Sequence, residues 1–486
     1  MIDRTSGRKR AARIGPKERT KVDLENVRSQ ARDLYRHNPY ARGTVNSIVA
    51  NLVGCGIRPQ PRVLLPKKGT PDQKFNDVAE EEWKRWADKC DPSGRESFYF
   101  QQQELQREFY VAGEALVAYS VPRDGRKTPL ATSILPSERL SMLEELNRKD
   151  GTSIFQGVES TVDGRILAYW LYPNHPYESV YGSDKPYRVP ADQVIHFFDS
   201  IEPEQIRGLS KFATVSGAFE GFMQWLDWLL TKERISAAFA VAITENAGLT
   251  VQSPLQTDDT DDLVDENGNA ISVLEGGMVA HLRPGEDIKG IASGVQASSV
   301  DLLSQIFLRV IARGLDVAYE LVARDLTKVT YLSARQGENQ DRRHWEPQQE
   351  NMNRVVNVPV WRRFVDLASM SGVIPKRAEL DRMAAVDFVR PGWDWIDPGK
   401  DVAADISAIQ AGIRSPLEVI QGKGGDAWKV LNDIATFRDW AKEKKLELSI
   451  FQPAKPAPIL TDVAEPKEPM NPDNIMQEAM DAQQEK

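Results

Sequence analysis

Two long amphipathic stretches, separated by a polar acidic insert, constrain the fold of this chain more than any other feature. Apolar side chains recur at spacings of three and four over residues 206–240 and again over residues 299–322. This spacing predicts two helical rods, and a helix of about 30 residues is about 45 Å long. Rods of that length suit a wall or a stem better than a compact catalytic pocket. An ordinary helix pair inside a large domain is the alternative.

Gly314 lies in the middle of the apolar stripe of the second rod. Glycine in a helix interior costs about 1 kcal/mol relative to alanine. We therefore predict that a neighbouring backbone approaches closely at Gly314, or that the helix kinks there.

The composition describes a large soluble protein. The chain has 486 residues, of which 41% are hydrophobic and 27% are charged. No apolar run approaches the roughly 18 residues that a bilayer span requires, so we expect no membrane partner. Two cysteines, Cys55 and Cys90, argue against a disulfide scaffold and suit a reducing cytoplasm.

The charge is unevenly distributed. The net charge of −9 weighs against tight wrapping of nucleic acid. Residues 1–42 hold 12 Lys and Arg against 5 Asp and Glu, whereas residues 452–486 hold 3 against 7. We predict a disordered basic arm over residues 1–20, with a docking arm as the alternative, and a disordered acidic tail over residues 453–486.

The remaining pattern predicts an α+β chain that is mainly helical. Proline disfavours helix at the preceding residue, so Asn38-Pro39 separates the first two helices. Pro359 is expected to bend or end a long helix. The predicted helices cover residues 21–37, 40–53, 72–89, 98–110, 338–371, 399–411, 416–421 and 427–448. Strands are predicted at residues 114–121, 154–162, 165–172, 193–198, 240–244, 270–274 and 277–282, and residues 324–336 are predicted as a loop.

Sequence motifs for catalysis are missing. A phosphate-binding P-loop needs Gly-Lys followed by a hydroxyl residue, but Gly424 follows Gly422-Lys423. There is no Gly-x-Ser-x-Gly and no His-Glu-x-x-His. Gly-Glu at 113–114 is a common dipeptide and by itself indicates no function. The chain is therefore predicted to be no enzyme.

An acidic cluster in the insert is the one candidate for a metal. Its carboxylates belong to Asp258, Asp259, Asp261 and Asp262. An EF-hand loop counted from Asp261 would need glycine at its sixth position and glutamate at its twelfth, where this chain has glutamate and serine. The cluster favours a solvated loop, and we expect no cofactor and no metal.

Several motifs, taken together and in order, resemble one known family. They are Arg-His-Asn-Pro-Tyr-Ala at 36–41, Val-Gly-Cys-Gly-Ile-Arg-Pro at 53–59, Gly-Glu-Ala-Leu-Val at 113–117, Val-Ile-His at 194–196, Gln-Ile-Arg-Gly-Leu-Ser at 205–210, Leu-Glu-Gly-Gly-Met at 274–278, Tyr-Leu-Ser-Ala-Arg at 331–335 and Trp-Ile-Asp-Pro at 395–398. Over about residues 25–425 the chain resembles the lambda-type portal proteins of tailed phages. Tyr331-Leu332-Ser333 departs from the more polar pairing expected there.

The resemblance implies a portal fold of wing, stem, clip and crown that assembles into a ring, usually of twelve subunits. Such a ring lies at one vertex of the capsid, and DNA enters and leaves through its channel. On this chain the wing would be residues 21–205, with a long helix and wing return at 337–396. The stem would be 206–240 and 298–323, the clip 241–297, the tunnel loop 324–336, and the crown 397–452.

The same resemblance implies partners and a location. The partners would be further copies of this chain, the terminase large subunit, a head-completion or adaptor protein, the major capsid protein and double-stranded DNA. The protein would belong to the virion and would assemble in the cytoplasm of the bacterial host. The aspartates at 258, 259, 261 and 262, in the clip, would be candidates for the terminase interface.

Arg324, Lys328 and Arg335 are the candidates for transient contact with DNA phosphates in the tunnel loop. Ordinary ion pairing near helix ends explains these three cations equally well. Twelve copies at −9 would carry −108, so most of the ring would repel DNA. Another head–tail connector is the alternative function. A packaging enzyme is a weaker one, because it would need a phosphate cradle or clustered metal-binding carboxylates.

Overall fold

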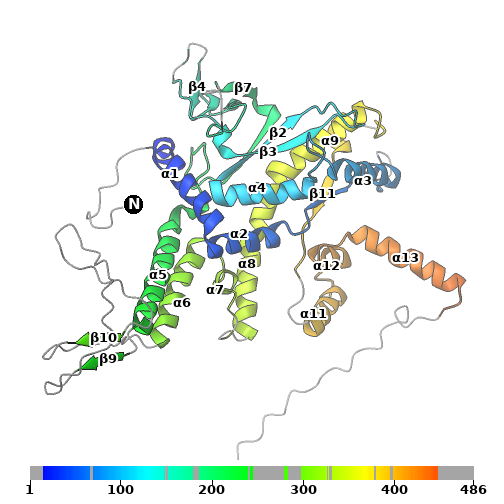
Figure 1. Cartoon of the computed structure of the whole chain (residues 1–486). Helices are drawn as coiled ribbons and strands as arrows, with labels where there is room; N and C mark the ends of the chain where they lie inside the picture. Colours follow the sequence, from blue (N-terminus) through cyan, green and yellow to red (C-terminus); the bar gives the residue numbers. More distant parts are fainter. Residues whose placement is uncertain are drawn as a thin grey trace, which may run out of the picture. The chain divides into compact units, whose positions relative to one another are not determined.

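The chain divides into two compact units, Met1–Asp426 and Ala427–Lys486, which we describe separately. The computed structural model describes residues 15–65, 69–146, 148, 151–178, 185–238, 241–244, 279–282, 297–325, 327, 331–376, 379–393 and 398–446. The first unit combines helices with small sheets (Figure 1), as the sequence predicted.

The first two helices meet at a sharp corner. Helix α1 (Pro16–His37) ends at Asn38, and α2 (Pro39–Leu52) begins directly after it. The side chain of Asn38 accepts a hydrogen bond from the backbone N–H of Ala41 at 3.0 Å, which caps α2. Because α1 begins at Pro16, the predicted disorder over residues 1–20 is wrong for residues 16–20. Proline fits the first turn of a helix, where its missing N–H is not needed.

An aromatic cluster forms the centre of the first unit. It joins α3 (Gln73–Ala87), α4 (Phe98–Ala112) and α9 (Val358–Met370). The ring of Trp83 lies 4.8 to 5.3 Å from four neighbouring rings, which belong to Trp86, Phe98, Trp361 and Phe364. Beside this cluster β1 (Arg58–Pro61) pairs antiparallel with β11 (Val386–Val389).

Two antiparallel sheets follow α4. The three-stranded sheet has the order β3–β2–β8, formed by Ala131–Leu135, Glu114–Ser120 and Val194–Phe198, and it packs on α4 (Figure 1). The four-stranded sheet has the order β4–β5–β6–β7, formed by Thr152–Phe155, Val158–Thr161, Ile166–Leu171 and Tyr187–Pro190. Short 3-10 helices cover Ser137–Arg139, Ala191–Gln193 and Lys211–Thr214.

The single strand predicted over residues 154–162 is wrong, because the chain folds back at Gln156-Gly157. Both residues have positive φ angles, 49° and 77°. A Cβ atom on Gly157 would lie 2.3 Å from the carbonyl oxygen of Ser141, so only glycine fits this turn. The segment is therefore a hairpin of β4 and β5.

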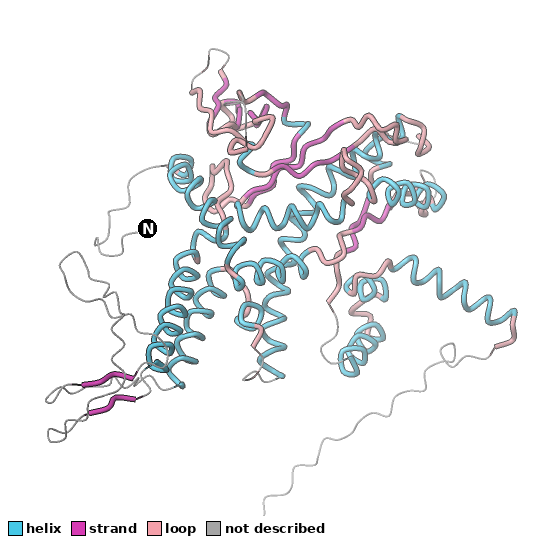
Figure 2. Tube along the Cα trace, in the orientation of Figure 1, coloured by secondary structure: helices cyan, strands magenta, loops and turns pink. Residues whose placement is uncertain are grey.

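Two antiparallel helices form a rod, whose first helix contacts α1 and the 3-10 helix Lys211–Thr214. Helix α5 (Ser216–Ala238) and helix α6 (Ala297–Gly314) lie side by side (Figures 1 and 2). The first helix was predicted to begin at residue 206, which is wrong. Residues 206–215 contain an extended segment and a 3-10 turn instead, because Arg207 and Gly208 are held against the start of β2.

The second rod is interrupted where Gly314 predicted a kink or a close approach. Helix α6 ends at Gly314, and α7 (Tyr319–Ala323) begins after a turn in which Asp316 has a φ of 54°. A Cβ atom on Gly314 would lie 2.2 Å from Cγ1 of Val215, at the base of α5. A close approach at Gly314 is therefore found, but it is made by a side chain and not by a backbone, and the helix ends there instead of kinking. The continuous helix predicted over 299–322 is wrong.

A parallel pair of short strands lies between the two rod helices in sequence. Strand β9 (Val241–Thr244) pairs with β10 (Val279–Leu282), which confirms strands at two of the three predicted places. The third strand, predicted at 270–274, lies outside the described residues. So do Asp258, Asp259, Asp261 and Asp262.

A long helix with an interrupted hydrogen-bond pattern follows. Helix α8 (Tyr331–Met352) continues through a π-helical turn (Asn353–Asn357) into α9. The loop predicted over 324–336 is wrong in its second half, because α8 already includes residues 331–336. Pro359 lies in the first turn of α9, just after the π-helical turn, so the predicted irregularity at this proline is confirmed.

Short helices complete the chain. In the first unit these are α10 (Leu380–Met383), α11 (Pro398–Gln410) and α12 (Pro416–Gly422). The second unit contains α13 (Ala427–Glu443), which ends before residue 448, the end predicted for it. The tail predicted over 453–486 lies outside the described residues. Within the described part of the chain, no helix has both the length and the hydropathy needed to cross a bilayer.

Candidate functional site

The structure gives two of the three candidate DNA-contacting cations separate protein partners. Arg324 ends α7 with a φ of 50°, and its guanidinium donates a hydrogen bond to Oγ of Ser47 on α2 at 2.8 Å. Arg335 lies on α8 and donates to Oδ1 of Asp401 on α11 at 3.0 Å. Lys328 lies outside the described residues. The two arginines are thus held by different elements.

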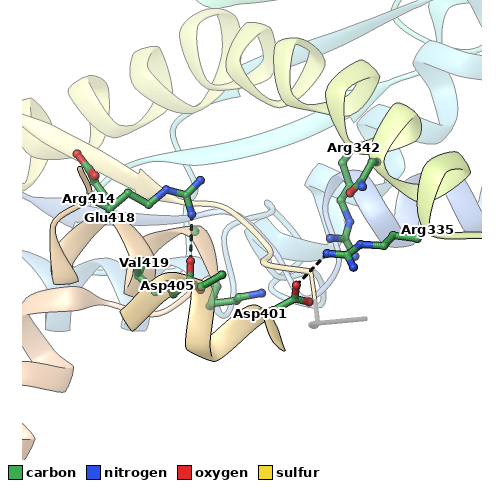
Figure 3. A pocket seen from close by; sticks show the side chains of 11 residues that line it. Arg335, Arg342, Asp401, Asp405, Arg414, Glu418 and Val419 are labelled. Atoms are coloured by element: carbon green, nitrogen blue, oxygen red, sulfur yellow. Dashed lines mark hydrogen bonds and ion pairs between the residues drawn. The ribbon is translucent and has the colours of Figure 1, made fainter. Parts of the chain in front are cut away.

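The pair formed by Arg335 and Asp401 borders a polar cavity of about 580 Å³ (Figure 3). Helices α8, α11 and α12 form its walls, and a second ion pair, Arg414 to Asp405 at 3.1 Å, crosses from the α11–α12 connection to α11. The lining residues include four cations (Arg335, Arg342, Arg414 and Lys423) and three carboxylates (Asp401, Asp405 and Glu418).

These ion pairs are partly exposed, with 38% of the Arg335 side chain and 20% of the Asp401 side chain open to solvent. Exposed ion pairs contribute about 0 to 1 kcal/mol. A phosphate that approached Arg335 would therefore compete with Asp401 at little cost. Arg335 therefore forms an ordinary ion pair near a helix end, which was the alternative considered for it.

A buried charge cluster lies at the base of the rod. The Glu114 carboxylate begins β2 and is fully buried. Arg207 donates to its Oε1 through Nη2 at 2.5 Å and through Nε at 2.9 Å, and Arg28 on α1 donates to the same oxygen at 2.9 Å. Its Oε2 lies 3.0 Å from Nε2 of His196 on β8 and accepts the backbone N–H of Gly208 at 2.9 Å.

The electrostatics of this cluster favour an ionised Glu114. Burial opposes ionisation, but the positive charge of Arg207, the hydrogen bond from His196 and the charge of Arg28 outweigh it, so the pKa of Glu114 is well below its usual range. Burial lowers the pKa of Arg28, yet a guanidinium remains charged in proteins. Arg207 also donates to the carbonyl of Gln156 at 2.7 Å, so the cluster joins both sheets and α1.

Two glycines allow the backbones to meet beside this cluster. A Cβ atom on Gly208 would lie 2.1 Å from the carbonyl oxygen of Gly113, and one on Gly113 would lie 2.2 Å from the carbonyl carbon of Leu209. No larger residue fits at either position without a backbone shift. The close contact places the amide of Gly208 within reach of Glu114.

The sequence patterns did not predict this cluster, although three of its residues lie in motifs that were identified. Glu114, His196 and Arg207 come from three separate motifs, at 113–117, 194–196 and 205–210. Local periodicity contains no information on which distant residues meet. The available signal was chemical: Glu114 and Arg207 are charged residues set among glycines and apolar residues, where a solvated face is not expected.

The rod has an apolar face that the described part of the first unit leaves exposed. Its inner face is packed, with the rings of Phe222 and Phe307 5.7 Å apart. On the outside of α6 the exposed fractions are 55% for Leu302, 46% for Ile306 and 54% for Val310. These three residues follow each other at spacings of four and therefore form one stripe.

Asp341 joins α8 to the start of α7. Its Oδ1 accepts the backbone N–H of Ala318, at the start of α7, at 2.9 Å. Burial raises the pKa of Asp341 to about 6, although the Ala318 hydrogen bond opposes this, and the nearby Glu320 and Glu338 raise the pKa further.

Among the described residues, no group of three or more His, Cys, Asp and Glu side chains is arranged to hold a metal ion. What the described part of the chain provides is a projecting helical rod, a cation-bearing segment next to it and a buried ionic joint at its base. These are features of a structural component.

Comparison with known proteins identifies the class. The family described as phage portal protein, lambda family, matches residues 3–349. The chain belongs to this family of portal proteins. The family is structural, and the resemblance noted in the sequence is thereby confirmed.

Individual relatives agree with this assignment. The probable portal protein of Halomonas phage phiHAP-1 is 27% identical over 436 residues, which cover 85% of this chain and 80% of that protein. Portal protein B of Escherichia phage lambda is 23% identical over 448 residues, which cover 82% of this chain and 81% of that protein.

A solved structure described as the neck of a native GTA particle, computed with C12 symmetry, is also similar. It is 15% identical, covers 81% of this chain and 90% of that chain, and has a TM-score of 0.41. At these values the likeness adds nothing to the assignment.

Proposed function

We propose that twelve copies of this protein form a ring at one vertex of a phage capsid, and that double-stranded DNA passes through the ring during packaging and ejection. In this proposal the α5–α6 rod is the stem and residues 241–297 are the clip. The segment between α7 and α8 faces the channel. The finished ring is part of the virion, and it assembles in the cytoplasm of the bacterial host.

The main support for the proposed ring is the exposed stripe on α6, which consists of Leu302, Ile306 and Val310. Within the residues that the structure describes, no third element covers this stripe. Trp228 on α5 adds another apolar surface, with 70% of it exposed. Exposed apolar surface of this kind marks an interface.

Two different surfaces, one on each helix, favour a head-to-tail arrangement. If the α6 stripe of one copy packs near α5 of the next, each copy uses both surfaces once. Head-to-tail contacts generate a closed ring when the rotation between copies closes. The rods would then stand next to each other around the channel.

The channel is proposed to hold DNA only weakly. The net charge of −9 on each copy gives −108 for twelve, so most of the ring repels the phosphate backbone. Arg324, Lys328 and Arg335 would supply the few attractive contacts. Because Arg324 and Arg335 already have protein partners, phosphate would bind them by exchange.

The docking partners follow from the place of the proposed clip in the sequence, between the two rod helices. We propose that the terminase large subunit binds there first and a head-completion or adaptor protein binds later. Asp258, Asp259, Asp261 and Asp262 would provide acidic contacts. The major capsid protein would surround the wing. The ring supplies no ATP hydrolysis in this scheme, because the motor belongs to the terminase.

The ring is tested by the Ile306→Lys variant. A lysine on the stripe places a charge where the next copy would pack, but it remains solvated in an isolated chain. We expect light scattering and electron micrographs to show annular particles for the wild type and mainly small species for the variant.

Val162→Lys is the matched control, because Val162 is an apolar residue that is 89% exposed in the turn between β5 and β6. This variant is expected to form rings as the wild type does. Wild-type protein that stays monomeric at high concentration contradicts the proposed ring. Normal rings from Ile306→Lys would show instead that the stripe is not the interface.

A further inference from the structure

A second basic cavity lies at the corner between α1 and α2. This corner cavity has a volume of about 480 Å³ and is bordered by α1, α2, α4 and the end of β3. Four arginines line it, namely Arg32, Arg36, Arg42 and Arg107, together with two glutamates and an apolar floor that includes Val111 and Ile134. Neither the proposed stem nor the proposed tunnel loop contributes to it.

One of the four arginines is already neutralised. Arg32 donates to Glu108 at 2.5 and 3.1 Å and to Glu138 at 2.5 and 2.6 Å. The Glu108 carboxylate also accepts the backbone N–H and the hydroxyl of Ser137. Both partners of Arg32 are therefore engaged by hydrogen bonds. Together, Arg32 and its two glutamates carry one net negative charge, which offsets only part of the charge of the three remaining arginines.

The other three arginines have no carboxylate partner within the described part of the chain. Arg36 and Arg42 are exposed, and neither makes a side-chain hydrogen bond or ion pair there. Arg107 donates to the neutral amide of Gln103 at 3.2 Å, and its guanidinium lies 5.7 Å from the centre of the Phe100 ring.

The second glutamate does not balance these charges. Burial raises the pKa of Glu104, and the nearby Glu96 raises it further, while Arg107 opposes this only in part. A carboxyl group with a raised pKa is a weaker counter-ion than an ordinary one. The cavity thus gathers three cations around an incompletely neutralised concave surface.

The position of two of these arginines is fixed by the helix corner. Arg36 lies in the last turn of α1, and Arg42 lies in the first turn of α2. Asn38 and Pro39 hold the two helices at this corner through the cap on Ala41. The motif at 36–41 and the adjacent Arg42 therefore place one arginine on each side of the corner.

We propose that the corner cavity binds a phosphate group. Guanidinium groups donate in a planar fork that matches two phosphate oxygens, and an apolar floor strengthens such bonds by excluding water. The phosphate comes either from the backbone of duplex DNA or from free inorganic phosphate. This site is separate from the tunnel loop, and it does not depend on the number of subunits.

The test measures binding of two probes to the full-length protein, inorganic phosphate and a short DNA duplex, at one constant ionic strength. The double variant Arg36→Gln with Arg42→Gln removes two cations from the cavity. We expect it to weaken phosphate-probe binding by about tenfold or more. In a second series, duplex binding is measured at several salt concentrations, and its salt dependence is expected to be shallower for this variant than for the wild type.

The matched control is Arg95→Gln with Arg165→Gln, which removes two exposed arginines elsewhere and changes the net charge equally. It is expected to bind both probes as the wild type does. Weaker duplex binding by the cavity variant alone identifies DNA as the source, and weaker binding of inorganic phosphate alone identifies the free anion. Equal binding by cavity variant and control overturns the site. Wild-type protein that binds glutamate as tightly as phosphate also overturns it.

Discussion

The fully buried carboxylate of Glu114 and the fully buried guanidinium of Arg207 are 93 residues apart in sequence and are joined by three hydrogen bonds, at 2.5 and 2.9 Å to Oε1 and at 3.0 Å to Oε2. Arg28 and His196 complete the cluster. Breaking a buried ion pair is costly because the remaining charges lose their counter-ion but stay away from water. The base of the rod therefore depends on this one carboxylate.

Glu114→Gln is predicted to lower the free energy of unfolding by about 3 to 5 kcal/mol. Glutamine keeps the shape but leaves Arg207 and Arg28 without a negative partner. Urea unfolding followed by circular dichroism measures the change. Glu81→Gln is the control, because the pair of Glu81 with Arg85 is exposed, and its loss is expected to cost less than about 1 kcal/mol. Similar small losses for both variants would contradict a special role of Glu114.

The pH dependence of this contribution has a definite sign. The pKa of Glu114 is lower in the folded protein than in the unfolded chain, so the stabilisation is present above the unfolded pKa. It is lost only as the pH falls through the folded pKa, in the strongly acidic range.

Gly208→Ala is predicted to destabilise the protein by about 3 kcal/mol or more, because the added methyl group meets the backbone of Gly113. Gly43→Ala is the control. Gly43 lies inside α2 with open space around it, and alanine there is expected to stabilise by up to about 1 kcal/mol. Thermal unfolding of the two variants is expected to shift in opposite directions. A harmless Gly208→Ala would show that the two segments can separate.

Asp341→Asn is predicted to stabilise the protein near neutral pH. The pKa of Asp341 rises from 3.8 to about 6 on folding, so the folded protein loses stability as the pH rises between these two values. Asparagine cannot ionise but still accepts the hydrogen bond from Ala318. We expect a gain of up to about 3 kcal/mol at about pH 8 and little gain at about pH 4. A gain of equal size at both pH values would rule out ionisation as the cause.

Substitutions at Lys328 and at the Arg335–Asp401 pair of the polar cavity are predicted to change DNA retention in opposite directions. Lys328→Ala and Arg335→Gln are expected to leave ring assembly intact and to reduce the DNA retained in filled particles. Asp401→Asn frees Arg335 for phosphate and is expected to increase retention. Because the Arg335–Asp401 pair is partly exposed, each of the two changes in it costs about 1 kcal/mol or less in stability. Loss of folding in Lys328→Ala would place that side chain in the core.

The sequence was sufficient for features with local causes. Proline and the asparagine before it separate α1 from α2, and Gly314 marks the close contact with Val215 at the base of the rod. The start of α5 was misplaced because apolar spacing continues through Phe212 and Val215. The segment from 206 is held instead by Glu114, which is far away in sequence. Tertiary contacts between residues this far apart in sequence cannot be inferred from a local pattern.

The candidate site was predictable only in part. The sequence identified Arg324 and Arg335 by charge and position, but it did not give their partners on α2 and α11. Those partners are brought close by tertiary packing. The start of α8 at Tyr331 is a similar case, because its first residues carry no clear apolar period.

The π-helical turn at Asn353–Asn357 sets the rotational phase between α8 and α9. One residue turns an α-helix by about 100°, so a single deletion within this turn would rotate Trp361 and Phe364 away from Trp83 while α8 kept its place. A point substitution there can be absorbed locally, but a change in length cannot. The number of residues between Met352 and Trp361 therefore cannot change without displacing the aromatic cluster.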